Sequence, residues 1–293
     1  MVTLEQLKVL VAVAECDSLK QAASRVYKSQ PALTLALKEL ENQLGVTLFD
    51  RNGYRIKLNS QGQIIYQKAL ISLSSVNDII QTAKHFNLGH EEKITLAVEA
   101  SFELKNILPR LEQCQQKYLH TQIVFKQQYL SGALELLQQG DVELAISPVL
   151  PQLFSVKEFE SKKIGQGKLL NVATPKLLSR HQNLKHQKQL VNDYQVIVQD
   201  TGSATKGLNF DVQSAQRNWY VNDFSAKLSL IQSGMGWGRL PEYLVREYIG
   251  RGQLVVLELD DMPSELNIEY HLLKQKGNTL GPVATYLWQQ FLT

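Results

Sequence analysis

The sequence has few cysteines and no long apolar run. Cys16 and Cys114 are the only cysteines among 293 residues, too few for a disulfide framework or a zinc site, so we expect two reduced thiols. No window approaches the roughly 20 consecutive apolar residues of a membrane-spanning helix. The N-terminus also lacks the cationic start and apolar run of a signal peptide. These absences predict a cytoplasmic protein with no bound metal and no membrane contact.

Charge of one sign is also scarce. The net charge is only +3, so the whole chain is not a polycation that would attract acidic partners. Residues 1–90 carry ten Lys/Arg against seven Asp/Glu, whereas residues 91–293 carry 21 of each. Within residues 18–57 the count is seven against three. The excess positive charge is therefore concentrated near the N-terminus.

Motifs of common enzymes are missing as well. There is no G-x-S-x-G elbow and no P-loop. Gly234, Gly236 and Gly238 have the wrong spacing for a dinucleotide-binding fingerprint, and the six histidines are dispersed. We therefore expect neither an enzyme nor a cofactor. The alternative is a small-molecule binding protein or enzyme with an incidental helical N-terminus, although a transport protein would need an export signal.

The N-terminal residues predict three short helices. A first apolar stripe starts at Leu4. Ser18 and Gln21 then form a capping-box pattern, and Ser29 can cap a third helix with Pro31 in its first turn. The third helix buries one leucine stripe and ends at Gly45. The stripe consists of Leu33, Leu37, Leu40 and Leu44.

The opposite face of this third helix has chemistry suited to DNA. Gln30 can contact adenine through two hydrogen bonds, Thr34 can contact a base edge, and Lys38 can reach guanine or phosphate. Ser29 and the free amides beside it suit a phosphate oxygen. Arg51 and Arg55 flank a predicted hairpin turn and can follow the DNA backbone. A small helical domain with solvated charges would give the same periodicity.

The pattern resembles the winged helix-turn-helix of LysR-type transcriptional regulators. The matching residues are Ala22-Ala23, Ser29-Gln30-Pro31-Ala32-Leu33-Thr34, Leu40-Glu41, Leu44-Gly45, Leu48-Phe49, Arg51, Leu58 and Gly62. The resemblance implies a DNA-binding domain over 1–59, with the helix-turn-helix at about 18–44 and the wing at 49–58. It implies that Gln30, Pro31, Thr34 and Lys38 face the major groove and that Arg51 and Arg55 serve the wing. One departure is Ser60-Gln61, where the family often has Thr-Pro.

Residues 60–88 are expected to form a long linker helix. Apolar residues recur there at alternating spacings of three and four, which is a heptad seam. The seam consists of Tyr66, Ala69, Leu73, Val76, Ile80 and Ala83. It predicts dimerisation, and the resemblance implies the same, giving a homodimer or homotetramer. An amphipathic helix packed on its own domain is the alternative.

From Lys93 onward, short apolar runs alternate with helical patterns. We expect strands at 94–98, 122–125, 143–146, 156–159, 169–173, 195–198, 236–240, 255–257 and 268–273, and helices at 104–116, 132–139, 223–232 and 283–292. This alternation predicts an α/β fold with a parallel sheet and a ligand crevice. The region resembles the effector domain of the same family, which is similar to periplasmic binding proteins. We infer lobe I from 92–161 plus 268–293 and lobe II from 162–267.

Polar groups at strand-to-helix turns are the candidate effector contacts, although ordinary helix caps would show the same pattern. They are Ser101, Ser131, Gly132, Ser147, Thr201, Gly202 and Ser203. The family's peroxide sensors carry reactive cysteines in the second lobe, and this lobe has none, while Cys114 is expected to be buried and inert. The predicted function is an effector-controlled regulator that binds double-stranded DNA, with RNA polymerase as a further partner if it activates transcription.

Overall fold

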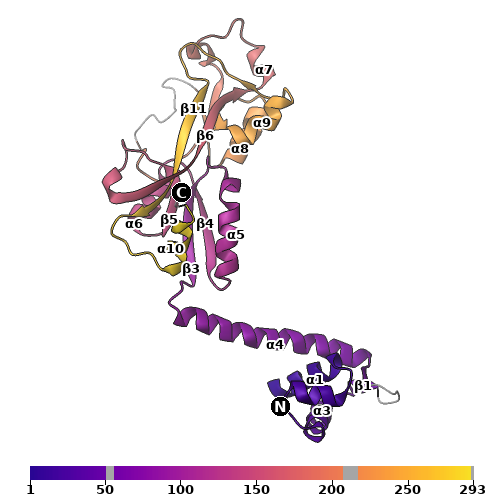
Figure 1. Ribbon diagram of the computed structural model, residues 1–293. Helices are drawn as coiled ribbons and strands as arrows, with labels where there is room; N and C mark the ends of the chain where they lie inside the picture. Colours follow the sequence, from indigo (N-terminus) through magenta and orange to yellow (C-terminus); the bar gives the residue numbers. More distant parts are fainter. Residues whose placement is uncertain (51–55, 207–216, 292–293) are drawn as a thin grey trace. The chain divides into compact units, whose positions relative to one another are not determined.

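The computed structural model describes residues 1–50, 56–206 and 217–291 (Figure 1). The chain divides into two compact units, Met1–Leu88 and Gly89–Thr293. No helix within the described ranges is both long enough and apolar enough to cross a membrane.

The first unit is mostly helical. Its helices are α1 (Leu4–Glu15), α2 (Leu19–Arg25), α3 (Gln30–Leu44) and α4 (Ser60–Asn87), and a short antiparallel pair joins β1 (Phe49–Asp50) to β2 (Lys57–Leu58). The predicted caps are present: the Ser18 and Ser29 hydroxyls accept hydrogen bonds from the amides of Gln21 and Ala32. Gly45 ends α3 in the left-handed region at φ +69°. These local signals therefore predicted the three helices correctly.

The core of the first unit surrounds α1. Val9 and Leu10 are fully buried and share one apolar cluster with Leu33 and Leu40 of α3. Ala69 of α4 belongs to the same cluster. The buried Glu41 carboxylate accepts a hydrogen bond from the Leu48 amide at 2.7 Å, which ties the end of α3 to the start of the β1–β2 hairpin. Packing thus fixes α3 with its leucine stripe inward and its polar face outward.

The second unit is built on a mixed sheet. Its principal strands are β3 (Lys93–Glu99), β4 (Gln122–Gln128), β5 (Leu144–Pro148), β6 (Phe159–Ala173) and β11 (Glu265–Gln275), in the order β6-β11-β5-β3-β4. β3 pairs in parallel with β4 and β5, but β11 runs antiparallel to both β5 and β6. The expectation of a parallel sheet was therefore correct only for part of it. β3, β4 and β5 are parallel because helices connect them, whereas β11 comes from the C-terminal part of the chain and pairs without such a connection.

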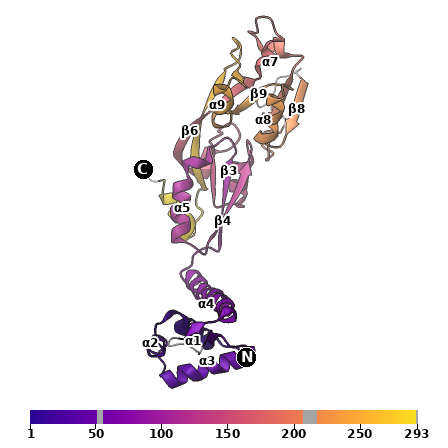
Figure 2. The same cartoon turned by 90° about the vertical axis from the view of Figure 1, so that its right-hand side faces the viewer.

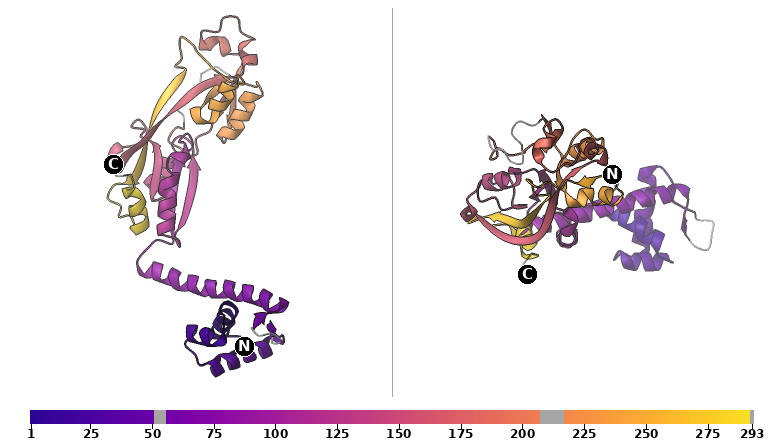
Figure 3. Two further views of the ribbon diagram at one scale, coloured as in Figure 1. Left: turned by 45° about the vertical axis from the view of Figure 1, so that its right-hand side comes forward. Right: turned by 90° about the horizontal axis from the view of Figure 1, so that it is seen from above.

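The two long strands β6 and β11 run through both lobes (Figures 1 and 3). They pair from Phe159↔Gln275 to Leu170↔Glu265. The sequence predicted separate strands at 156–159 and 169–173, which was wrong, since Val156–Glu158 is a 3-10 helix and β6 is continuous from Phe159. Exposed charged residues lie in the middle of β6, so the apolar pattern of the sequence does not reveal that the strand continues there.

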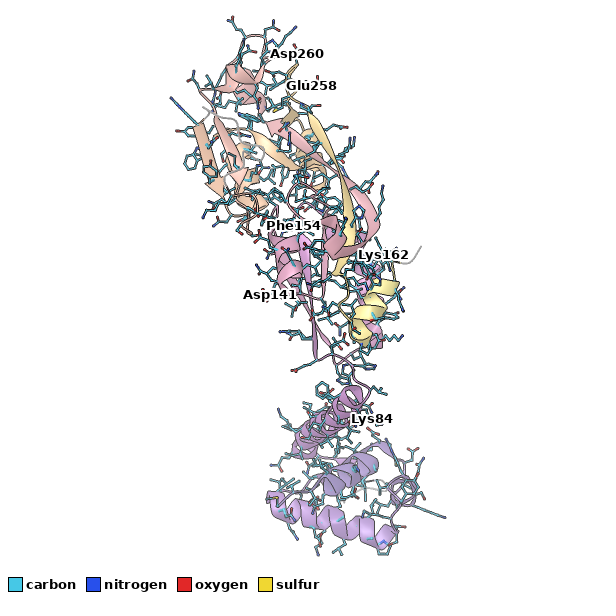
Figure 4. The ribbon with its side chains drawn as sticks, turned by 90° about the vertical axis from the view of Figure 1, so that its left-hand side faces the viewer. Lys84, Asp141, Phe154, Lys162, Glu258 and Asp260 are labelled. Atoms are coloured by element: carbon cyan, nitrogen blue, oxygen red, sulfur yellow. The ribbon has the colours of Figure 1, made fainter. Side chains whose placement is uncertain are left out.

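Helices cover both faces of the lobe I sheet. α5 (Leu108–Lys117) and α10 (Pro282–Gln289) share an apolar cluster with Leu96 and Val98 of β3, whereas α6 (Gly132–Gln139) packs with Ala97 on the other face. Alternating residues of β3 thus serve two cores, as expected for a strand buried on both sides. Lys162 lies beside α10 (Figure 4), where its ammonium donates to the Trp288 carbonyl at 3.0 Å.

Lobe II contains short strands of its own (Figure 2). β7 (Tyr194–Val198) pairs in parallel with β8 (Arg217–Val221), while β9 (Gly238–Pro241) and β10 (Val255–Val256) pair antiparallel with β6. Its helices are α7 (Pro175–Leu178), α8 (Phe224–Gln232) and α9 (Glu242–Gly250). The sequence did not predict β8, α7 or α9. β8 and α7 are only five and four residues long, too short for a period. In α9, by contrast, the apolar residues do lie at helical spacing, and sequence reasoning missed them: Leu244, Val245, Tyr248 and Ile249.

Candidate functional site

The polar face of α3 is an exposed, continuous surface. Gln30, Pro31, Thr34 and Lys38 are all exposed, and together with Leu35 they line one shallow hollow. Sequence reasoning missed Leu35, which is 58% exposed on this face. A hollow lined by an amide, a hydroxyl, an ammonium and apolar groups matches the donors, acceptors and methyl groups of a DNA major groove.

Local hydrogen bonds at the start of α3 fix the orientation of this face. The Thr34 hydroxyl donates to the Gln30 carbonyl at 3.0 Å, so its oxygen remains able to accept a hydrogen bond from another group. The Ser29 hydroxyl accepts a hydrogen bond from the Ala32 amide at 3.4 Å. Pro31 has no N–H, so Gln30 supplies the remaining backbone donor of the first turn. Arg51 and Arg55, the two predicted wing residues, lie outside the described residues.

The predicted seam on α4 has two environments. Ala69 is buried, and Tyr66 and Leu73 pack against the same core as α1. The Tyr66 hydroxyl also donates a hydrogen bond to the Glu15 carboxylate at 2.7 Å. This bond is the main reason why the pKa of Glu15 lies below its ordinary value, and the hydrogen bond from Arg25 is the second. Val76 is half-buried, whereas Ile80 and Ala83 are exposed. The first half of the seam is thus used within its own domain.

The second unit contains a cavity of about 550 Å³. Both lobes contribute to it, and so do the long strands between them. Its polar and charged lining residues are Glu99, Ser101, Gln152, Lys227, Arg239, Asn267, Glu269 and His271. Its apolar lining residues are Leu130, Pro148, Val149, Leu150, Leu169, Ile197, Val198, Phe224, Leu266 and Ile268. A mostly apolar cavity of this size with a few polar groups is typical of a small-molecule site.

A buried carboxyl group lies in the wall of this cavity. Burial raises the pKa of Glu99 to about 7, and hydrogen bonds from the Ser101 hydroxyl and amide offset this only in part. Ser101 in turn accepts a hydrogen bond from the Tyr270 hydroxyl at 2.7 Å. Of the predicted effector residues, only Ser101 lines the cavity. Its hydroxyl already donates to Glu99 and accepts from Tyr270.

Four of the other predicted effector residues belong to one hydrogen-bonded junction. Asp200 accepts from the Ser131 amide and the Gly202 amide, each at 2.9 Å, and from the Ser131 hydroxyl at 2.6 Å. The Ser203 amide donates to Glu135 of α6, and the Thr201 hydroxyl accepts from the Tyr129 amide. The junction joins the turn before α6 to residues 200–205, and it does not line the cavity.

Close packing and ionisation both support this junction. A Cβ on Gly132 would lie 2.2 Å from the Thr201 hydroxyl oxygen, so no larger residue fits there without movement. Burial opposes ionisation of Asp200, but the hydrogen bonds from Ser131 and Thr205 outweigh it and lower the pKa of Asp200. Ser147 lies elsewhere, buried on β5 opposite His271, and its hydroxyl bonds to the Pro148 carbonyl at 3.0 Å.

Comparisons with known families agree with this architecture. Residues 4–63 match the model of the bacterial regulatory helix-turn-helix protein, lysR family, and residues 88–293 match the LysR substrate binding domain. The chain belongs to the LysR family of transcriptional regulators. It is therefore a DNA-binding transcriptional regulator with an effector-binding domain, and the sequence-based family assignment and α/β fold class are confirmed.

Individual members of the LysR family are distant from this chain. The uncharacterized HTH-type transcriptional regulator YeeY of Escherichia coli K12 is 26% identical over 86% of this chain and 82% of its own length. The HTH-type transcriptional regulator AceR of Acinetobacter baumannii is 23% identical over 97% of this chain and 94% of its own. Among solved structures, full-length LysG of Corynebacterium glutamicum with bound effector Arg has a TM-score of 0.52, with 18% identity and coverage of 99% and 97%.

The cavity residues of this LysR-family chain were almost all missed by sequence reasoning. Lys227 lies inside the helical pattern of α8, and Arg239 lies on a four-residue strand. A cation at a predicted buried helix position is the signal that could have identified Lys227, because such burial is rare without a partner. Cys114 is fully buried, and burial raises its pKa to about 11, as expected for an inert thiol.

Proposed function

We propose that this regulator recognises double-stranded DNA through the exposed polar face of α3 and the two wing arginines. The observation that carries the proposal is the grouping of Gln30, Pro31, Thr34 and Lys38 on one exposed hollow, opposite the buried leucines of α3, which are Leu33, Leu37 and Leu40. Base contacts would come from Gln30 and Thr34, and phosphate contacts from Lys38 and the Ser29 turn. The family-level function requires such a surface, and this one lies in the matched segment.

We propose further that the cavity holds the effector and that α4 brings two copies together as a homodimer or homotetramer. A ligand between two lobes can change their arrangement, and it controls DNA binding only if its affinity differs between the two states. The junction at Ser131, Asp200 and Thr201 would then hold the lobes beside the effector instead of contacting it. We place this activity in the cytoplasm, with RNA polymerase as a further partner if the protein activates transcription.

Substitutions on α3 test the DNA proposal. Gln30→Ala should remove about 1–3 kcal/mol of discrimination at one base pair, because a bidentate contact is lost. Lys38→Ala should weaken binding to all sequences and reduce the slope of log affinity against log salt by roughly 1. The measurement is fluorescence anisotropy on a genomic site found by footprinting, at several salt concentrations.

Gln43→Ala is the matched control, because Gln43 is exposed on α3 but does not line the hollow. It should leave both affinity and specificity unchanged. If Gln30→Ala lowered the affinity for matched and mismatched DNA sites equally, the result would contradict a base contact by Gln30. A purified protein without any salt-sensitive preference among genomic fragments would contradict the DNA proposal as a whole.

A further inference from the structure

One leucine of α3 points away from the protein. This helix lies wholly within the described part of the chain and contains five leucines. Three of them, Leu33, Leu37 and Leu40, are buried, and Leu44 packs partly against the same core. Leu35 is 58% exposed and is not among the described residues that form or border this core. It is also the only large apolar side chain that α3 exposes.

Helical geometry places Leu35 at the middle of the outward face. Each residue of an α-helix advances by about 100° around the axis, so residues two positions away lie about 160° apart. The residues two positions before and after Leu35 are Leu33 and Leu37, and both are buried. Leu35 therefore points almost directly away from the core. The packing of the domain does not require an apolar residue at this position.

The neighbours of Leu35 in the α3 hollow are one apolar residue and one cation. Pro31 lies four residues earlier and Lys38 three residues later, which are the spacings that bring side chains together on one side of a helix. Both are exposed and line the same hollow as Leu35. Pro31 and Leu35 thus form a small apolar surface, and Lys38 beside it supplies positive charge. This charge favours a polyanion over an apolar protein partner.

The major groove of DNA offers one apolar group, the C5-methyl group of thymine. A leucine has no donor or acceptor with which to read a base edge, so it gains free energy only by removing apolar surface from water. Among the four bases, thymine alone presents such surface in the major groove. Leu35 is the sixth residue of α3, within the N-terminal part from which a recognition helix contacts base edges.

We propose that Leu35 contacts the methyl group of a thymine in the major groove and so selects a T·A base pair at one position of each half-site. This inference rests on the proposed function, in which the exposed face of α3 binds the major groove. It adds a residue that selects a base by apolar contact, beside the hydrogen-bonding residues Gln30 and Thr34.

Deoxyuridine in place of thymidine tests this contact, because the exchange removes only the methyl group from the groove. Each thymidine of a genomic site found by footprinting is replaced in turn. Fluorescence anisotropy then measures the affinity of the full-length protein for each duplex. At one position of each half-site the exchange should weaken binding by about fourfold, which is the effect of exposing one methyl-sized apolar group that was buried.

Variants assign this response to one side chain. Leu35→Ala should bind the original site at least about fourfold more weakly and should no longer distinguish deoxyuridine from thymidine at that position. Thr34→Ser is the matched control, because it removes the methyl group of the neighbouring residue and keeps its hydroxyl. It should retain the full response to deoxyuridine. Because Leu35 is exposed, Leu35→Ala should leave the melting temperature and the oligomer mass unchanged.

Three results would overturn the thymine contact. One is an unaltered protein that responds to deoxyuridine at no position. Another is a response that persists in Leu35→Ala, which would assign the methyl contact to another side chain, and to Thr34 if Thr34→Ser abolishes it. A lower oligomer mass for Leu35→Ala would assign the exposed leucine to a protein contact. Salt-sensitive specific binding of the original site reports on the proposed function separately: specific binding without a response to deoxyuridine rejects only the thymine contact.

Discussion

At the residue scale, Glu99 is the group whose chemistry depends most on its surroundings. It ends β3, is buried, and accepts a hydrogen bond from the Ser101 amide. Three tyrosine hydroxyls lie around it: those of Tyr129, Tyr243 and Tyr270. Burial is the largest cause that raises their pKa values, and the charge of Glu99 raises them further. The pKa of Tyr243 reaches about 12. These tyrosines stay neutral across the physiological range, so Glu99 alone among these four groups titrates there.

This environment predicts a pH-dependent stability. The Glu99 pKa is about 7 when folded and near 4.5 when unfolded, so the native state binds the extra proton between these values. The stabilisation of the folded state by this proton is therefore largest below about pH 4.5 and is lost as the pH rises to about 7. Glu99→Gln should stabilise the protein relative to the original at pH 8, by on the order of 1–3 kcal/mol, and much less at pH 5.

Denaturant unfolding at a series of pH values measures this difference. Glu258→Gln is the control, because Glu258 is an exposed carboxylate of lobe II (Figure 4) and should give the same small change at every pH. A Glu99→Gln effect that does not vary between pH 5 and pH 8 would show that Glu99 does not exchange its proton with folding.

At the scale of the element, α4 separates into a packed side and an exposed side. Tyr66, Ala69 and Leu73 face the core of their own domain. A second apolar stripe is exposed: Ile64, Ile71, Ile79 and Phe86 follow one another at intervals of seven or eight residues, which places them on one side of the helix. An exposed stripe of this length on one helix is typical of a protein-protein contact.

We expect the second half of α4 to carry the homodimer contact. Ile79→Asp should lower the oligomer mass in sedimentation equilibrium, because a charge would be buried in the contact, while the fold of the monomer is kept. The control is Asn77→Asp, an exposed position on the other side of the helix. Leu73→Asp should instead lower the melting temperature, since Leu73 packs on α1 within its own domain. An unchanged mass for Ile79→Asp would refute this contact.

At the scale of the whole molecule, recognition and control lie in different compact units. The α3 hollow lies entirely within Met1–Leu88, and every residue that lines the cavity lies within Gly89–Thr293. A ligand can therefore control DNA binding only through a coupling free energy between the two units. Each unit has its own apolar clusters, and among the described residues none of these clusters includes members from both units.

Independent cores predict that residues 89–293 fold alone. Expressed by itself, this unit should unfold cooperatively in calorimetry, at a temperature close to that of the same transition in the full-length protein. The full-length protein is the comparison. A fragment that is unfolded would show that residues 1–88 are needed to stabilise this unit.

The sequence by itself determined α3 and its exposed polar face. Ser29, Pro31 and Gly45 delimit α3 through contacts within one or two turns, and Leu33, Leu37 and Leu40 mark its buried side at helical spacing. Such signals are local, so they can be recognised without the rest of the chain. The family also followed from this segment, because its motifs lie in a fixed order over a short stretch.

Only the tertiary structure decided the cavity and the use of α4. Glu99, Lys227 and Arg239 lie far apart in the sequence, and the pairing of β6 with β11 brings their elements together. The same applies to Ser131 and Thr201, predicted as effector contacts and found joined through Asp200 and Tyr129. Contacts over long sequence separations depend on how whole elements pack, and a periodic pattern carries no information about that packing.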